Sequence, residues 1–529
     1  MIRHRRMAAA VAVACSAALV LGACGSGGDS GSEANSTAAT VEAGDPVAGG
    51  TGRVLQSGEP RSLDPAALSN TWAHQPLLGN ALYGTLMITN NDTFELEYKM
   101  ATDFSSDDGG KTFTLSLQPD LVFSDGTPLE AEAVKYNWDR LKDPALGSTT
   151  IRQASEVEST EVIDPHTLRV TLVDPNPQFG QAVVAGALNW VAAPAALEQG
   201  REAFDANPIG AGPFTLVNWA RQDAIELEKN PQYWDAPKPY LEGLVVRTVA
   251  DSNQRSNTMT TGGADIAAET NWSNINKAEA AGLQYVVTST GGGQYAGMNQ
   301  RRAPFDDERA RRAVSLAVDL DAVNTVVYNG EGEVPTTFFP EDSPYYADIP
   351  LGETNTEQAQ QLFDELAAEG KPVSFTFLSY PTTESRVLAE AIQAQLSAFE
   401  NVEMNVEVTD FAAVTARAGA RDFDMIISSA ITQDPDYALS TAFASGSSGN
   451  FMGVNNPDLD TALQSGRFGE TQEERKQAYD EVQQILADSV VGIWYTRGVP
   501  AATFSADMHG VQLFSLGSNL PEELWISSN

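Results

Sequence analysis

The sequence predicts a mixed α/β protein, and three observations carry the prediction. In some stretches apolar residues alternate with polar ones, as in half-buried strands, and in others they recur every three or four residues, as in amphipathic helices. These two kinds of stretch follow one another along the chain, without a repeat of short period. A chain of 529 residues is long enough for two or three domains with substantial cores.

The amino-terminal segment is arranged like an export signal. A basic start is followed by an apolar run from Met7 to Val20, which is too short for a permanent membrane span. The next four residues, Leu21-Gly22-Ala23-Cys24, resemble the lipobox of bacterial lipoproteins. That resemblance implies that 1–23 is a signal peptide, cleaved before Cys24, and that the Cys24 thiol is acylated. An ordinary signal peptide and a short anchor helix are the alternatives.

Composition limits what the exported chain can do. It has two cysteines, Cys15 and Cys24, and Cys15 would leave with the signal peptide. The remaining chain then has no pair for a disulfide and no cysteine cluster for a metal. The formal net charge of -39 makes nucleic acid and anionic lipid headgroups unfavourable partners. Gly, Ser, Ala and Thr dominate residues 24–50, which we expect to be the lipidated cysteine and a flexible tether.

Strand patterns dominate the first half of the chain. Strand-like segments occur at 111–117, 166–172, 225–227 and 244–249. Between the first two, Thr127 and Glu130 have the spacing of a capping box, with Pro128 suited to a first helical position. We therefore expect Thr127 to cap a helix.

Helical spacing dominates the second half. Helical stripes occur over 309–324, 358–368 and 384–399, and a second capping box, Thr471 with Glu474, precedes another helix. Strand-like segments at 402–408 and 424–427 lie between these helices. The second half therefore also predicts alternating helices and strands.

The sequence contains no motif typical of catalysis. Its four histidines, His4, His74, His166 and His509, lie far apart and none has a metal-binding spacing. Gly109-Gly110-Lys111-Thr112 lacks the earlier glycine of a phosphate-binding loop and predicts a hairpin turn, while 291–293 and 445–449 predict loops. We expect a binding protein with no catalytic residue, metal or cofactor. The alternative is an exported hydrolase whose site forms only in the tertiary structure.

Several motifs connect the chain to a known family. In order, they are Ser62-Leu63-Asp64-Pro65, Leu82-Tyr83-Gly84-Thr85-Leu86, Phe123-Ser124-Asp125-Gly126-Thr127-Pro128-Leu129, Pro208-Ile209-Gly210-Ala211-Gly212-Pro213-Phe214, Asn230-Pro231-Gln232-Tyr233-Trp234 and Tyr295-Ala296-Gly297-Met298-Asn299. Together they resemble the bacterial extracellular solute-binding proteins of family 5, the peptide- and nickel-binding components of ABC importers. Their glycines and prolines form tight turns, so the motifs identify a scaffold and say little about the ligand.

The resemblance implies a periplasmic-binding-protein-like fold of two α/β lobes that close over a ligand by hinge bending. It assigns lobe I to 51–82, 207–299 and 496–529, an extra domain inserted in lobe I to 83–206, and lobe II to 300–495.

Candidate ligand contacts follow from the same resemblance. Asp434-Pro435-Asp436 resembles a loop of the peptide binders in which the second aspartate meets the peptide ammonium. A buried carboxylate needs such a cationic partner. The alternative is a turn in which Asp434 and Asp436 bind local backbone amides.

Four other residues are weaker candidates. Arg386 matches an arginine that pairs with the peptide carboxylate in dipeptide-binding relatives, and the alternative is a surface arginine paired with an acidic neighbour. Tyr295 and Asn299 are expected close to the cleft, and Trp72 is an aromatic candidate.

We therefore expect a monomeric substrate-binding lipoprotein on the extracytoplasmic face of the cell membrane. It would capture a short peptide or peptide-like solute and deliver it to an ABC permease. The residues between Asp424 and Asp434 lack the tryptophan found there in many peptide binders. A non-peptide solute, such as a metal chelate or a sugar, and a sensor role therefore stay open.

Overall fold

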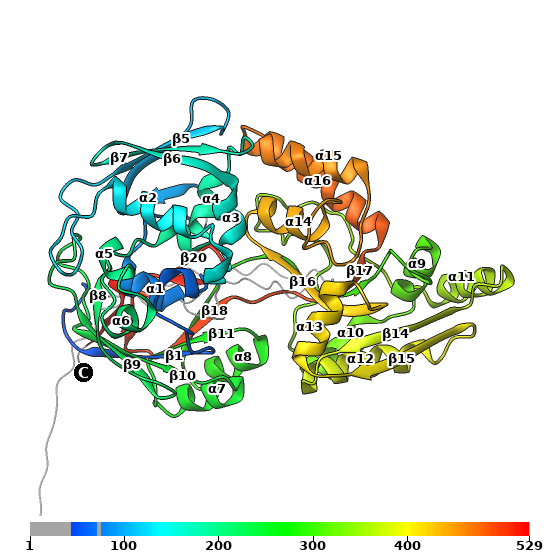
Figure 1. Cartoon of the computed structure of the whole chain (residues 1–529). Coiled ribbons are helices and arrows are strands. Elements are labelled where there is room, and N and C mark those ends of the chain that lie inside the picture. Colours follow the sequence, from blue (N-terminus) through cyan, green and yellow to red (C-terminus); the bar gives the residue numbers. More distant parts are fainter. Residues whose placement is uncertain (1–43, 71–75, 92, 528–529) are drawn as a thin grey trace, which may run out of the picture. The chain divides into compact units, whose positions relative to one another are not determined.

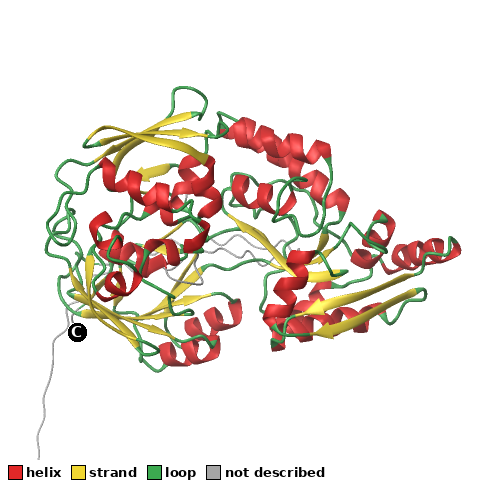
Figure 2. Ribbon diagram, viewed as in Figure 1, coloured by secondary structure: helices red, strands yellow, loops and turns green. Residues whose placement is uncertain are grey.

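Helices and strands alternate throughout the computed structural model, which describes residues 44–70, 76–91 and 93–527 (Figure 2). The predicted mixture of α and β structure is therefore confirmed. The signal segment, Cys24, most of the expected tether and Trp72 lie outside the described residues. No helix in the described part of the chain is long and apolar enough to cross a membrane.

A seven-stranded sheet brings together segments that are far apart in sequence. Its strands, in order across the sheet, are β12 (Gln284–Val287), β18 (Ala501–Phe504), β11 (Ile266–Glu269), β1 (Thr51–Gln56), β10 (Gly243–Thr248), β9 (Ala224–Lys229) and β8 (Phe214–Ala220). Because β1 pairs in parallel with β10 and with β11, the first described strand lies inside the sheet.

A five-stranded sheet forms the centre of the second half. Its strands, in order, are β15 (Val402–Val408), β14 (Val373–Ser379), β16 (Met425–Thr432), β13 (Gly291–Met298) and β17 (Gly492–Thr496). The chain passes between the two large sheets at 288–290 and again at 497–500. The predicted lobe and domain boundaries remain predictions.

A four-stranded antiparallel sheet lies in the segment expected to form the extra domain. Its order is β4 (Ala101–Ser105), β5 (Thr112–Leu117), β7 (Thr167–Leu172) and β6 (Val157–Asp164). Helix α2 (Ala131–Arg140) packs against β6 and β7 (Figure 1). Short two-stranded pairs are β2 (Met87–Thr89) with β3 (Leu96–Tyr98), β19 (Met508–His509) with β22 (Trp525–Ile526), and β20 (Leu513–Phe514) with β21 (Ser518–Asn519).

The other helices cover these sheets. In the first half and the segment leading to β13 they are α1 (Pro76–Tyr83), α3 (Ile151–Glu156), α4 (Phe179–Val184), α5 (Pro194–Leu197), α6 (Arg201–Ala206), α7 (Ser252–Thr260) and α8 (Trp272–Ala280). In the second half they are α9 (Glu308–Leu316), α10 (Leu320–Tyr328), α11 (Thr356–Ala368), α12 (Thr383–Leu396), α13 (Phe411–Ala420), α14 (Pro435–Phe443), α15 (Pro457–Phe468) and α16 (Gln472–Ser489).

The buried apolar side chains form separate clusters. The largest joins the seven-stranded and four-stranded sheets and includes Trp138 and Trp190. Two others lie around the five-stranded sheet, one including Phe305 and Phe375, and one including Tyr295 and Trp494. Since apolar burial is the main favourable term in folding, each large sheet has its own stabilising core.

Most predicted elements are confirmed, and the second capping box is among them. The Thr471 hydroxyl accepts from the Glu474 amide, and the Glu474 carboxylate accepts from the Thr471 amide at 3.2 Å. The first capping box is wrong. The Thr127 amide and hydroxyl both donate to Asp125, at 2.9 and 2.6 Å, so Thr127 belongs to a turn and α2 begins only after Glu130.

The predicted helix over 309–324 is two helices. Helix α9 ends at Leu316 and α10 begins at Leu320, because the Asp319 carboxylate accepts from the Ala322 amide at 3.0 Å and starts a new helix. The apolar stripe continues across the break, which is why the sequence pattern alone did not locate it.

The glycine run 291–293 is also not the expected loop, because it begins the interior strand β13. Gly292 has a φ of +70°, and a Cβ atom there would lie 1.9 Å from the Ala430 carbonyl oxygen of β16. A Cβ atom on Gly293 would lie 2.3 Å from the Thr496 carbonyl oxygen of β17. Glycine therefore lets β13 pass between its two neighbours at close range.

Candidate ligand-binding site

A cavity of about 1000 Å³ lies beside β16. Residues of β13, β16, α13 and α14 form one part of its wall, and Thr89, Phe94, Gln178 and Gln181 contribute another part from the first half of the chain. Its lining is mostly apolar, with scattered hydroxyl and amide groups. Large apolar cavities with a few placed polar groups are typical of small-molecule sites.

Strand β16 offers this cavity an unpaired edge. On one side β16 pairs with β13 along its whole length, from Met425 opposite Met298 to Thr432 opposite Gly291. On the other side β14 pairs only with Met425 and Ile426. Within the described chain, Ile427–Thr432 thus has no second strand, and these residues line the cavity. Backbone groups along that edge are available to a ligand.

Asp434 lies at the junction of β16 and α14, where it caps the helix by accepting from the Asp436 amide at 3.1 Å. Its carboxylate also binds Arg475, with Nη1 to Oδ2 at 2.8 Å and Nη2 to Oδ1 at 3.0 Å. The Arg475 guanidinium donates further to the Gly466 carbonyl and to the Tyr345 hydroxyl. Burial, and secondarily the Asp434 charge, raise the pKa of Tyr345 above its ordinary value.

Asp436, in the first turn of α14, has a cationic partner of its own. Its side chain is almost fully buried, and its Oδ1 atom lies 2.9 Å from Arg467 Nε. Burial raises the pKa of the Asp436 carboxyl, and the neighbouring guanidinium works against that rise. Burial likewise raises the pKa of Glu156 in α3, again opposed by Arg467. Asp434 and Asp436 therefore each pair with a guanidinium within the protein.

Hydrogen bonds join the two halves of the chain, and two of them start from residues that line the cavity. The Gln433 Nε2 atom donates to Asn91 Oδ1 at 3.1 Å, and Gln178 Nε2 donates to the Gly469 carbonyl at 3.4 Å. Arg152 donates to Ser447 Oγ at 3.3 Å. Two lining residues, Gln433 and Gln178, thus hydrogen-bond to the other half of the chain.

The structure brings three of the sequence-predicted residues together, since Asp434, Asp436 and Tyr295 all line the cavity. Tyr295 packs on Trp494 with ring centroids 4.4 Å apart, and burial raises its pKa to about 12. Asn299 is fully buried and donates to the Phe423 carbonyl at 2.8 Å, so it braces the backbone before β16.

Arg386 lies apart from these residues. It is not among the cavity-lining residues of the described chain, its side chain is half exposed, and its Nε atom lies 3.9 Å from Glu390 Oε1. The contact of Arg386 with a ligand stays a prediction, as do the direct ligand contacts of the other candidates. Sequence reasoning missed Gln433, Arg467 and Arg475. For the two arginines the only available signal was that buried aspartates need cations, and for Gln433 there was none.

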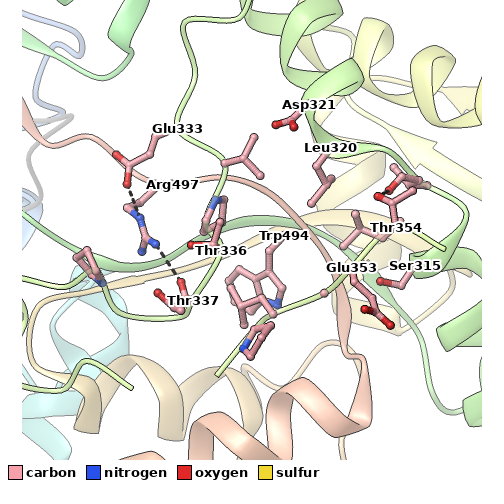
Figure 3. Close-up of a pocket in the computed structure, with 18 of the residues that line it drawn as sticks. Ser315, Leu320, Asp321, Glu333, Thr336, Thr337, Glu353, Thr354, Trp494 and Arg497 are labelled. Carbon is pink, nitrogen blue, oxygen red and sulfur yellow. Dashed lines mark hydrogen bonds and ion pairs between the residues drawn. The ribbon is translucent and has the colours of Figure 1, made fainter. Parts of the chain in front are cut away.

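A second cavity, of about 580 Å³, lies beside the start of α10 (Figure 3). Acidic side chains such as Asp321, Glu333 and Glu353 line it. Arg497 is held there by Glu333, 2.7 Å from its Nε atom, and by the carbonyl of Thr337, 2.9 Å from Nη2. It contains none of the predicted site residues, so the cavity beside β16 is the candidate site. No described group of histidine, cysteine, aspartate or glutamate side chains could hold a metal ion.

A family model and curated relatives match this chain. The family described as bacterial extracellular solute-binding proteins, family 5 (middle region), matches residues 95–450. The chain is 28% identical to the glutathione-binding protein GsiB of Pectobacterium atrosepticum over 407 residues, which cover 73% of this chain and 77% of the relative.

Solved structures show the same fold. The oligopeptide-binding protein AppA of Bacillus subtilis, in complex with a nonapeptide, has a TM-score of 0.72 at 20% identity, with 91% of this chain and 100% of that chain covered. The dipeptide-binding protein of Pseudoalteromonas sp. SM9913, in complex with Met-Leu, has a TM-score of 0.76 at 20% identity, with coverage of 90% and 100%. The expected two-lobe α/β architecture is confirmed by these likenesses.

Proposed function

Because the chain belongs to the bacterial extracellular solute-binding proteins of family 5, we propose that it captures a short peptide or peptide-like solute in the cavity beside β16. The relatives reported above are named as binding proteins, which supports binding rather than catalysis. The ligand would be enclosed between the lobes, and closure would present it to an ABC permease.

The free edge of Ile427–Thr432 is the observation that carries this proposal. An extended peptide can pair with a strand edge through its own backbone amides and carbonyls, with side chains alternating between the two faces. Such pairing depends little on side-chain identity. The surrounding cavity, at about 1000 Å³, has room for a peptide of a few residues.

A peptide bound along this edge should respond to N-methylation with a period of two residues. Amides that face β16 lose a hydrogen bond when methylated, whereas the alternating amides face away. We expect about a tenfold loss of affinity, the equivalent of one net hydrogen bond, at every second position. Isothermal titration calorimetry with a singly methylated series of one apolar tetrapeptide measures this. The outward-facing positions serve as the control, and uniform affinities along the series would contradict strand pairing.

We also propose that the protein is a monomeric lipoprotein held at the extracytoplasmic face of the cell membrane through Cys24. The lipobox-like sequence before Cys24 and the polar composition of 25–50 support this. A tethered receptor stays close to its permease and keeps the freedom to dock on it.

Cys24→Ser should move the protein from the membrane fraction to the soluble fraction, because the serine cannot carry the thioether-linked lipid. Cell fractionation followed by immunoblotting measures the distribution. Cys15→Ser makes the same chemical change within the signal segment and should leave the protein in the membrane fraction. Tight membrane association of Cys24→Ser would count against lipidation.

A further inference from the structure

Among the residues that the structure describes, the lining of the cavity beside β16 has no charged side chain without a partner of opposite charge. Resting on the function proposed above, we infer that the solute is an uncharged, amide-bearing peptide whose ends carry neither a free ammonium nor a free carboxylate. Peptides that are both N-acylated and C-amidated, and cyclic peptides, belong to this class.

The first support is the pairing of the acidic side chains. Among the lining residues that the structure describes, Asp434 and Asp436 are the only charged ones. Each already faces its own guanidinium, Asp434 at 2.8 Å from Arg475 and Asp436 at 2.9 Å from Arg467. A ligand ammonium would have to compete with these guanidinium groups for carboxylates that already have a cationic partner within the protein.

The wider surroundings are balanced in the same way. Glu156 adds a third carboxyl close to Arg467, and Arg152 adds a third guanidinium, which acts on Glu156 and lies 5.9 Å from the Tyr437 ring centroid. These three carboxyls and three guanidinium groups match in number, while Arg421, 4.4 Å from the ring centroid of the lining Phe451, donates to the Ala418 carbonyl. An incoming ammonium would upset this balance, and transfer of a charge out of water without a partner is unfavourable.

A carboxylate at the opposite end of a zwitterionic peptide finds no ion-pair partner in the described lining either. Within the described lining there is no lysine, arginine or histidine side chain. Arg386, the expected partner of a carboxylate, lies outside that lining. A free carboxylate would lose its hydration without gaining a cation, whereas an amide in its place would not.

The second support is Gln433, which lines the cavity directly after the free strand edge and is 7% exposed. Its Nε2 atom donates to Asn91, but its buried Oε1 atom has no hydrogen-bond partner among the residues that the structure describes. An unsatisfied buried acceptor is unfavourable, and the terminal torsion of glutamine is soft enough to turn it toward a ligand. The partner it needs is a neutral N–H or O–H donor, such as a ligand amide.

The test compares four forms of one tripeptide, Ala-Leu-Ala, on the full protein by calorimetry: free, N-acetylated, C-amidated, and blocked at both ends. We expect the doubly blocked form to bind at least tenfold more tightly than the free form, with the singly blocked forms between them. Equal or tighter binding of the free form overturns this inference and leaves the proposed function standing. Binding of none of the four overturns both.

A variant of Gln433 tests the second support independently. Gln433→Leu keeps the side-chain size but removes the acceptor, together with the hydrogen bond to Asn91, and it should weaken binding of the doubly blocked peptide about tenfold. Gln178→Leu, which removes an amide elsewhere in the same lining, is the matched control and should change this affinity less. Thermal unfolding of both variants establishes that they fold. An unchanged affinity in Gln433→Leu would overturn the role of Gln433.

Discussion

Replacing Arg475 with methionine should lower the free energy of unfolding by about 3–5 kcal/mol, as expected when one partner of a buried ion pair is removed. Arg475 is only 5% exposed, and its side chain binds the Asp434 carboxylate through two nitrogens. Methionine would fill much of the space, but it would leave Asp434 without a cation and the Gly466 carbonyl without its donor. Denaturant unfolding followed by circular dichroism measures the change.

The neighbouring residue supplies the control for this prediction. Lys476 pairs with Asp480 one turn along the same helix, at 2.7 Å, but both side chains are more than one third exposed. Lys476→Met should therefore change the stability by less than about 0.5 kcal/mol. The double variant Asp434→Asn with Arg475→Met should recover part of the loss, because the unpaired charge is gone. Equal losses in Arg475→Met and Lys476→Met would show that the buried pair contributes little.

Gly292→Ala should lower the free energy of unfolding by about 3 kcal/mol or more. An alanine there would carry the strain of a positive φ, and its Cβ atom would collide with the Ala430 carbonyl of β16. The same collision would push β13 away from the strand that lines the cavity. We therefore expect a loss of peptide affinity in calorimetry together with the loss of stability in denaturant unfolding.

Gly109→Ala separates the two contributions to this effect. Gly109 has a φ of +71°, close to the +70° of Gly292, but a Cβ atom there would meet nothing within 4 Å. Gly109→Ala should lower the free energy of unfolding only by the backbone strain, roughly 1–2 kcal/mol, and should leave the peptide affinity unchanged. If Gly292→Ala and Gly109→Ala lose the same stability, close packing of β13 against β16 is not important.

The sequence was sufficient for elements whose cause is local. The strand over 112–117 and the helix after Thr471 follow from periodicity and capping, which involve only neighbouring residues. The prediction of secondary structure failed where a residue far away in the sequence determines the local conformation. The sequence of Gly291–Gly293 predicts a loop. In the structure these glycines begin a strand that leaves no room for side chains, because a Cβ atom at Gly292 or Gly293 would collide with the carbonyl oxygen of Ala430 or Thr496.

The same distinction applies to the candidate site. The Asp-Pro-Asp sequence located Asp434 and Asp436, and the structure places both in the cavity lining. Their cationic partners are 41 and 31 residues away along the chain, on α16 and α15, so no local pattern could identify them. The unsatisfied Oε1 atom of Gln433 likewise could not be predicted from the sequence. Among the described residues it has no hydrogen-bond partner only because of the side chains that surround it in the folded protein.

The half-paired strand β16 has a consequence for how the protein behaves in a crowded solution. Strand edges that are open to solvent can template pairing with other chains and so promote aggregation, and proteins commonly protect them with lysine or proline. Ile427–Thr432 contains neither, and no charged residue. Because this edge faces a cavity walled by the same chain, a strand from another molecule would have to enter that cavity to reach it. The protein can therefore keep an unprotected edge without the self-association that such an edge promotes on an open surface.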